Sequence, residues 1–268
     1  MRRFPPIRAA VLGLLAFAAS GAGRAAAEPD LLLAYDVYYS GITIMEVEAQ
    51  VALADDARSA YAILIRGRTV GLAHTLKPVA FTAISEGVSN GHGLEPARYV
   101  TTTEKRSKHK GLTVAFLPHG APMTRFTPPD DAEEPAPPEL LKNVIDPASA
   151  MLTLIRTLSD TATCAGTLQV FDGKRRYDAE LADLPGETLE KSSYSIYSGD
   201  ARRCHLAIVP LHGFKPGKST PWEDTTIWFG PVLDGAPPLP VRIDSQISIG
   251  PVRLHLVSAR WLDQRASR

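Results

Sequence analysis

The sequence lacks an excess of basic residues, a long internal apolar run and any short motif for a metal or a nucleophile. Lys plus Arg number 29 and Asp plus Glu number 29, so the formal net charge is zero. This balance argues against nucleic-acid binding, which requires a basic face toward the phosphates. No internal stretch is apolar over the roughly 20 residues that a membrane-spanning helix needs. We therefore predict no transmembrane segment in the body of the chain.

Catalytic and metal-binding motifs are also missing. The seven histidines form neither His-x-His nor His-Glu-x-x-His, so no zinc site is readable. Ser149 lacks the Gly-x-Ser-x-Gly turn that exposes a nucleophile. The sequence predicts no catalytic residue, no metal site and no cofactor, and it leans away from an enzyme. A hydrolase whose residues gather from distant strands stays open, because sequence order does not reveal such a site.

The N-terminal 27 residues have the three parts of a secretory signal peptide. Arg2, Arg3 and Arg8 give a basic start, and the apolar run 9–19 that follows is too short to span a membrane. Small residues at Ala25-Ala26-Ala27 form a cleavage site. No cysteine lies nearby, which excludes a lipid anchor on the first mature residue.

We predict cleavage after Ala27 and export to the periplasm of a Gram-negative-type cell. Residues 28–268 would then form one β-rich domain. The removal of four arginines and no acid leaves 25 bases against 29 acids, a net charge of −4. Cys164 and Cys204 are the only cysteines and both remain in the mature chain. In an oxidising compartment two such thiols pair, so we predict a disulfide between them.

Alternating apolar and polar residues predict a chain built mostly of β-strands. Met45, Val47, Ala49 and Val51 alternate with polar residues, the period of a half-buried strand. Short turns between such segments imply antiparallel pairing, and Asp172-Gly173 predicts a hairpin turn. The further strand segments are 61–65, 98–103, 112–116, 168–171, 177–181, 194–196, 206–209, 225–229, 243–249 and 252–261.

Two stretches break the strand pattern. Residues 118–139 are rich in proline and acids, and we expect an exposed loop or flap there without strand or helix. Asp146 and Pro147 then predict the start of a helix, at the N-cap and the first helical position. This helix, expected over 146–158, carries one apolar stripe that must pack on the sheet. The stripe consists of Met151, Leu154, Ile155 and Leu158.

Three segments of this chain resemble an exported bacterial family of unknown function, DUF3108. They are Tyr35 to Gly41 (YDVYYSG), Asp146 to Ala150 (DPASA) and Gly166 to Ala179 (GTLQVFDGKRRYDA). The resemblance covers most of the mature chain and implies a periplasmic β-rich protein without an assigned activity. In outline the chain is also similar to periplasmic lipoprotein carriers and to a β-spiral envelope-integrity protein, which is an analogy of fold alone.

These patterns together predict a mainly β fold, a strongly curved antiparallel sheet wrapped around or capped by one α-helix, as an open barrel or β-spiral. Such a fold favours a non-catalytic cell-envelope protein that binds an apolar or amphipathic ligand, a lipid or another envelope component, in the concave face of its sheet. Arg175, Tyr177 and Trp222 are the candidate ligand-binding residues, whereas Trp228 and Trp261 are expected in the core. A structural or partner-binding protein without a ligand is the alternative.

The basic run 105–110, with Lys105, Arg106, Lys108, His109 and Lys110, leaves two interpretations open. In the first interpretation, the run contacts anionic lipid head groups or a polyanion. In the second, it is the solvated tip of a hairpin.

Overall fold

The computed structural model describes residues 30–52, 59–89, 93–118, 120–129, 134–215, 224–247 and 250–262. The signal peptide predicted for residues 1–27 lies outside these ranges, as does Trp222, so both remain predictions. No helix within the described ranges is both long enough and apolar enough to span a membrane.

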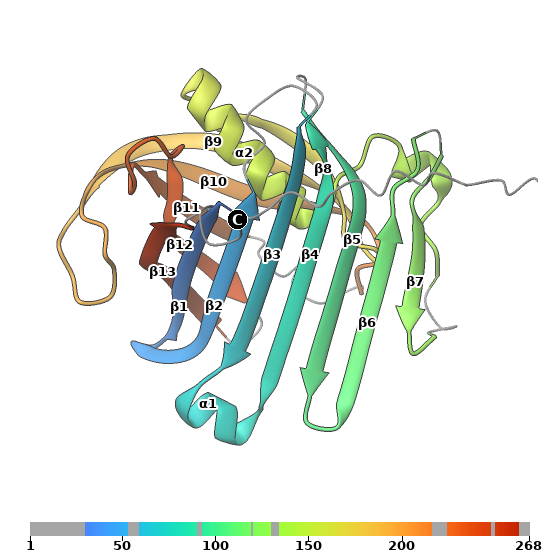
Figure 1. Cartoon of the computed structure of the whole chain (residues 1–268), viewed down its shortest axis with the longest axis horizontal. Helices are drawn as coiled ribbons and strands as arrows, with labels where there is room; N and C mark the ends of the chain where they lie inside the picture. The colour runs from blue at the N-terminus through green and yellow to red at the C-terminus, as the bar shows by residue number, and fades with distance from the viewer. Residues whose placement is uncertain are drawn as a thin grey trace, which may run out of the picture.

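The described residues form one antiparallel sheet of thirteen strands (Figure 1). Across the sheet the order is β7-β6-β5-β4-β3-β2-β1-β13-β12-β11-β10-β9-β8, so the first and last of the described strands pair near its middle. The strands are β1 (Leu31–Tyr39), β2 (Ile42–Ala52), β3 (Ala60–Thr69), β4 (Val79–Ser89), β5 (Leu94–Lys105), β6 (Lys108–Ala115), β7 (Met123–Thr127), β8 (Gly166–Phe171), β9 (Arg176–Leu189), β10 (Gly199–His212), β11 (Asp224–Gly230), β12 (Leu239–Ile247) and β13 (Gly250–Trp261).

The sheet curls, so that strands β2–β7 form one wall in Figure 1 and β8–β11 lie behind it. The alternation read from the sequence is visible on β1, where Leu31, Leu33 and Tyr35 are buried and the residues between them are half-buried. A long sheet of alternating strands twists and coils in this way, with one face turned to the core. The predicted fold class, a curved sheet with a helix against its concave face, is confirmed.

Helix α2 (Pro147–Thr161) lies between the two walls. Its N-cap is Asp146, and Pro147 occupies the first helical position, as predicted. The stripe is also confirmed: Leu154, Ile155 and Leu158 are buried and Met151 is half-buried. The helix ends beyond the predicted residue 158. It packs on β3 through Ala148 and Leu152, against Tyr61 and Ile63, and on β9–β11 through Leu154, Ile155 and Leu158, against Leu181, Cys204, Ile227 and Phe229.

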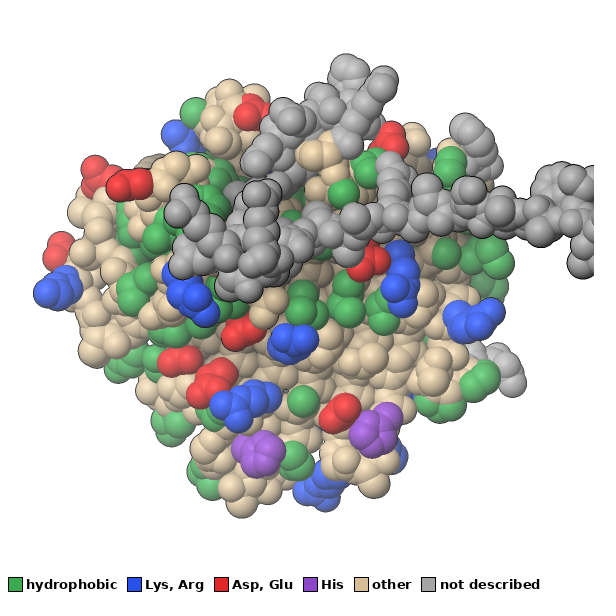
Figure 2. All heavy atoms as spheres, in the orientation of Figure 1, with side chains coloured by type: hydrophobic (Ala, Val, Ile, Leu, Met, Phe, Trp, Pro, Cys, Tyr) green, Lys and Arg blue, Asp and Glu red, His purple; other side chains and the backbone are tan. Residues whose placement is uncertain are grey.

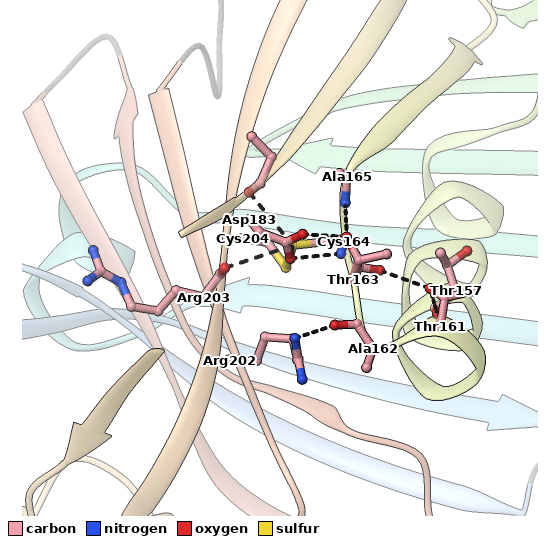
Figure 3. The surroundings of a disulfide bond; sticks show 11 residues. Thr157, Thr161, Ala162, Thr163, Cys164, Ala165, Asp183, Arg202, Arg203 and Cys204 are labelled. Carbon is pink, nitrogen blue, oxygen red and sulfur yellow. Dashed lines mark hydrogen bonds between the residues drawn. A yellow bond between two sulfur atoms is a disulfide. The ribbon is translucent and has the colours of Figure 1, made fainter. Parts of the chain in front are cut away.

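Cys164 and Cys204 form the predicted disulfide, with their Cα atoms 6.0 Å apart (Figure 3). Cys164 follows the end of α2 and Cys204 lies on β10, and both are buried. Beside them the backbone N–H of Cys164 donates to Asp183 Oδ1 at 3.0 Å, and Thr163 donates to the same carboxylate. The crosslink therefore ties the C-terminal end of α2 to the back wall of the sheet.

The expectation of no strand or helix in 118–139 is wrong. β7 pairs with β6, and a 3₁₀ helix, η1 (Pro138–Leu141), follows at the end of this segment. The β7 segment contains no proline of its own, so its backbone keeps every ladder donor, and η1 starts at a proline whose fixed φ suits a first helical turn. The charged residues Asp130, Asp131 and Glu133 lie outside the described residues.

Two smaller expectations also fail. Tyr194–Ile196, predicted as a strand, lies in the irregular connection between β9 and β10, where Ile196 makes one backbone hydrogen bond to Leu256. Trp261, expected in the core, is 40% exposed because it ends the last strand of the chain. Trp228 is buried as expected. The first helix, α1 (Gly71–Leu76), and strand β4 have no counterpart in the sequence interpretation.

The two ends of the curled sheet meet by side-chain packing. The turn 172–175 between β8 and β9 confirms the predicted hairpin, with four residues in place of two, and Asp172 accepts from the N–H groups of Lys174 and Arg175. Gly173 has a positive φ of 91°, and a Cβ there would lie 2.7 Å from Val114 of β6. Glycine is therefore required where this turn contacts the opposite wall.

Candidate functional site

Helix α2 and the segment 134–145 occupy much of the concave face. Leu141 and Val144 of this segment are buried against Tyr99 and Val114 of the front wall and Phe171 of β8. The segment also bridges the edge of β8, because the N–H of Ile145 donates to Gln169 and its carbonyl accepts from Phe171. The seam between the two ends of the sheet is thus filled by the chain itself over part of its length.

A pocket of about 340 Å³ remains on the concave face at this seam. We call it the seam pocket. Its floor comes from inward-facing residues of β5 and β6, its side from β7 and the two prolines that follow, and Lys174 of the β8–β9 turn closes it. It combines threonine hydroxyls, two lysines and apolar groups. The lining residues are Thr101, Thr103, Lys110, Gly111, Leu112, Phe126, Thr127, Pro128, Pro129 and Lys174.

Of the predicted ligand-binding residues, Arg175 and Tyr177 do not line the seam pocket, and Trp222 lies outside the described residues. Arg175 follows Lys174 and places its guanidinium 5.7 Å from the centre of the Phe214 ring. Tyr177 packs edge-on against the same ring at 6.2 Å, and burial raises the pKa of its hydroxyl. Arg176, the third basic residue of this turn, is 4% exposed and holds η1 by donating to the carbonyl of Leu140 at 2.8 Å.

Sequence reasoning missed the residues that line most of the seam pocket. Lys110 and Leu112 alternate with outward-facing residues on β6, and this alternation was the available signal. Phe126 lies on β7, which was not predicted because the surrounding segment 118–139 is rich in proline. No pattern along the chain indicates that the β8–β9 turn reaches β6, because that contact joins opposite ends of the sheet.

A buried polar cluster lies at the N-terminus of α2. Ser149 donates to Asp146 Oδ2 at 2.6 Å, Ser85 donates to the same oxygen at 2.8 Å, and the Tyr61 hydroxyl is 2.7 Å from Ser149 Oγ. Burial raises the pKa of Asp146, although four hydrogen bonds to its carboxylate oppose that shift. All three side-chain partners and the carboxylate are almost fully enclosed. The cluster therefore caps α2 and joins it to β3 and β4, and no substrate reaches it.

A second, open groove of about 530 Å³ lies beside the β1–β2 turn and the adjoining parts of β12 and β13. His255 is the central titratable group, stacked on Tyr194 at 6.0 Å and edge-on to Tyr38 at 5.7 Å. Burial, and after it the charges of Arg242 and Arg253, lower the pKa of His255 to about 4.

Asp244 holds the arginine side of this groove. It accepts bidentate hydrogen bonds from both Arg242 and Arg253. Burial opposes its ionisation, but these hydrogen bonds outweigh that effect and lower its pKa. Each arginine therefore gives two of its five N–H donors to Asp244, and the groove presents both aromatic and charged side chains.

One grouping of metal-ligating residue types occurs within the described ranges, formed by Cys164, Asp183 and Cys204. The two sulfurs are bonded to each other, so neither is a thiolate, the form of cysteine that binds metals. This grouping is therefore part of the structural crosslink.

Comparison with known proteins agrees with this architecture. The model of a family described as "Protein of unknown function (DUF3108)" matches residues 34–257. The chain belongs to the DUF3108 family. Among solved structures, a β-barrel-like protein of domain-of-unknown-function family DUF1849 from Brucella abortus aligns with a TM-score of 0.50 and 13% identity, covering 89% of this chain and 100% of that one. This second likeness is one of fold alone. No curated relative matches the chain.

Proposed function

We propose that this DUF3108 protein is an exported, non-catalytic cell-envelope protein that binds an amphipathic molecule with an anionic head in the seam pocket. The observation that carries the proposal is the composition of that pocket, in which Leu112 and Phe126 face the same space as Lys110 and Lys174. An apolar wall beside the ammonium group of Lys110 suits one acyl chain with a carboxylate or phosphate head. The signal-like segment at residues 1–27 supports export.

The size and placement of the seam pocket support the same conclusion. Its volume of about 340 Å³ is near the lower end of small-molecule pockets, which begin at roughly 300 Å³. A single chain of modest length fits such a space, and a whole two-chain lipid does not. Thr101 and Thr103 add hydroxyl groups that hydrogen-bond a head group without committing the site to one charge state.

The test uses protein recovered from the periplasmic fraction of the producing cells. Native mass spectrometry and lipid analysis of an organic extract look for a co-purifying amphipath, and 11-(dansylamino)undecanoic acid serves as the titration probe. We expect Lys110→Gln and Phe126→Ser each to weaken probe binding about tenfold. The matched control variants Lys142→Gln and Met123→Ser change exposed residues away from the pocket and leave binding unchanged.

Several results would contradict the proposal. If the protein were absent from the periplasmic fraction, the proposed export would be wrong. Equal probe binding by pocket and control variants, or no binding at all, removes the ligand site.

The second candidate is a structural or partner-binding envelope protein, and the packing of segment 134–145 favours it. Leu141 and Val144 already occupy concave surface that a larger ligand would need. A stoichiometric protein partner in the native mass spectrum, without a co-purifying amphipath, selects this candidate.

A further inference from the structure

The edge of the sheet that carries α1 combines exposed apolar side chains with exposed basic ones. Leu72 and Leu76 of α1 are each 66% exposed, and Ile42 at the start of β2 is 61% exposed. Figure 1 places α1, the β1–β2 turn and the β5–β6 turn together along the lower edge. We call this edge the α1 rim. It consists of Ile42, Leu72, Leu76, Lys77, Lys105, Arg106 and Lys108.

Helix α1 projects its apolar residues to solvent. None of its six residues is buried. Leu72 and Leu76 are four positions apart, so they lie on the same side of the helix. The helix is nevertheless anchored, because the N–H of Val70 donates to Ile44 of β2 at 3.0 Å and Thr69 accepts from the N–H of Val79 at 3.0 Å. A fixed support thus holds two leucines out in water, where they gain nothing for folding.

Basic residues lie directly beside these leucines. The Arg106 guanidinium donates to the carbonyl of Leu76 at 3.1 Å, and Lys105 is paired with Val79 across β4 and β5. Lys77, Lys105 and Lys108 are exposed and, within the described part of the chain, form no ion pair. In Figure 2, green, blue and purple side chains lie at the lower edge with red beside them, and both charge signs also occur over the rest of the visible face.

One of the two acids near the α1 rim offsets part of this charge. Glu46 is paired with Arg68 at 2.7 Å, whereas Glu104 lies 3.6 Å from His109, which is charged only when protonated, and adjoins Lys105 in the sequence. Four basic residues at the rim therefore face solvent in a mature chain whose predicted net charge is −4. The charge of the rim is therefore positive, opposite in sign to the predicted net charge of the mature chain.

We propose that the α1 rim docks on the surface of an anionic phospholipid bilayer. Leu72, Leu76 and Ile42 would enter the boundary between head groups and acyl chains, and the basic residues would contact the phosphates. Membrane-surface binding strengthens with buried apolar area and with basic residues close to anionic lipid, and the rim supplies both at one edge. This interpretation decides between the two that the basic run left open, since a merely solvated hairpin tip needs no leucines beside it.

Docking at the α1 rim goes beyond the proposed ligand and does not depend on it. Lys110 follows the rim lysine Lys108 on β6 and lines the seam pocket. A docked molecule would thus hold the pocket close to the bilayer. Vesicle binding and probe binding are measured separately, so one proposal can fail while the other still holds.

The test is sedimentation of the purified full protein with vesicles of phosphatidylglycerol and phosphatidylethanolamine, against vesicles of phosphatidylcholine. We expect binding to the anionic vesicles that weakens as salt is raised. Leu72→Ser with Leu76→Ser, and separately Lys77→Gln with Lys105→Gln and Lys108→Gln, should each weaken it at least tenfold. Only the lysine variant should also lose the salt dependence. Arg106 is left unchanged because it holds α1.

Two control variants match these changes in number and chemistry. Lys142→Gln with Lys191→Gln and Lys215→Gln removes three exposed lysines outside the rim, and Met123→Ser with Leu211→Ser removes two exposed apolar side chains. All variants have the same N-terminal segment, so any vesicle binding by that segment is equal in every comparison between variants. Unfolding curves confirm that each variant is folded.

Three outcomes would overturn the proposal. The first is equal binding to both vesicle types, or none. The second is loss of heparin binding in the lysine variant with vesicle binding intact, which would make the rim a polyanion site. The third is a shift from dimer to monomer in the leucine variant, which would make the rim an interface between copies of this chain.

Discussion

The two α-helices in the described part of the chain are used in opposite ways. Helix α2 has 15 residues and buries seven of them between the walls of the sheet, whereas α1 has six and buries none. At α2 apolar side chains fill the core and the polar ones near its start find partners inside it. At the α1 rim apolar side chains point outward beside lysines. The comparison shows that α2 stabilises the interior of the curled sheet, whereas α1 presents a surface to solvent.

The sharpest way to test this difference is the same substitution at both helices. Leu154→Asp places a carboxylate among Leu181, Ile227 and Phe229 without a partner, and we expect a loss of about 4 kcal/mol or more in the free energy of unfolding. Leu72→Asp places the carboxylate at a position that is 66% exposed. The free energy of unfolding should change there by less than about 0.5 kcal/mol. Urea unfolding at pH 7 measures both.

Leu154→Asn separates volume from charge at the buried site, since it carries no charge and should cost less than the aspartate. If Leu154→Asp and Leu72→Asp lowered the free energy of unfolding equally, α1 would contribute to the core as much as α2 does. The contrast between the two helices would then be wrong.

The disulfide sharpens the comparison at the α2 end. The double variant Cys164→Ala with Cys204→Ala opens a loop closed by residues 40 apart, for which the chain-entropy model gives about 4 kcal/mol. We expect a loss of about 2–4 kcal/mol in denaturant unfolding, with vesicle binding by the α1 rim unchanged. Alkylation of the native protein should find no free thiol. Two free thiols, or a variant as stable as the parent, would contradict a structural role.

The groove around His255 should give the smallest effect, and it should depend on pH. The pKa of His255 falls from 6.5 to about 4 on folding, so between these values the unfolded chain binds more protons and the free energy of unfolding decreases as pH drops. We expect about 1–2 kcal/mol from this group, after allowing for the solvent screening of a half-buried ring. His255→Asn should flatten stability between pH 6.5 and 4 and leave the steeper loss at lower pH.

Asp244, Arg242 and Arg253 all face this ring, so the control is Arg253→Gln, which should raise the pKa of His255 as followed by NMR. An unchanged pH slope in His255→Asn would assign the acid sensitivity to the carboxylates.

Sequence patterns could predict features that depend on neighbouring residues. Asp146 and Pro147 predicted the start of α2 because a cap is a local device, and strand alternation predicted one buried face. Helix α1 was missed because six residues give no measurable period. The seam pocket was missed because Lys174 and Leu112 belong to opposite ends of the sheet, and their approach depends on the summed twist of all the strands between them.

The pairing of β1 with β13 gives this sheet an unusual assembly order. Leu31 lies opposite Trp261, so the middle of the sheet forms only when strands from distant parts of the sequence meet. Until then β1 and β12 are unpaired edges of two separate half-sheets, each a template for the wrong partner. Long-range closure of this kind slows folding. A folding chain of this design therefore stays open along its centre until β1 and β13 have paired.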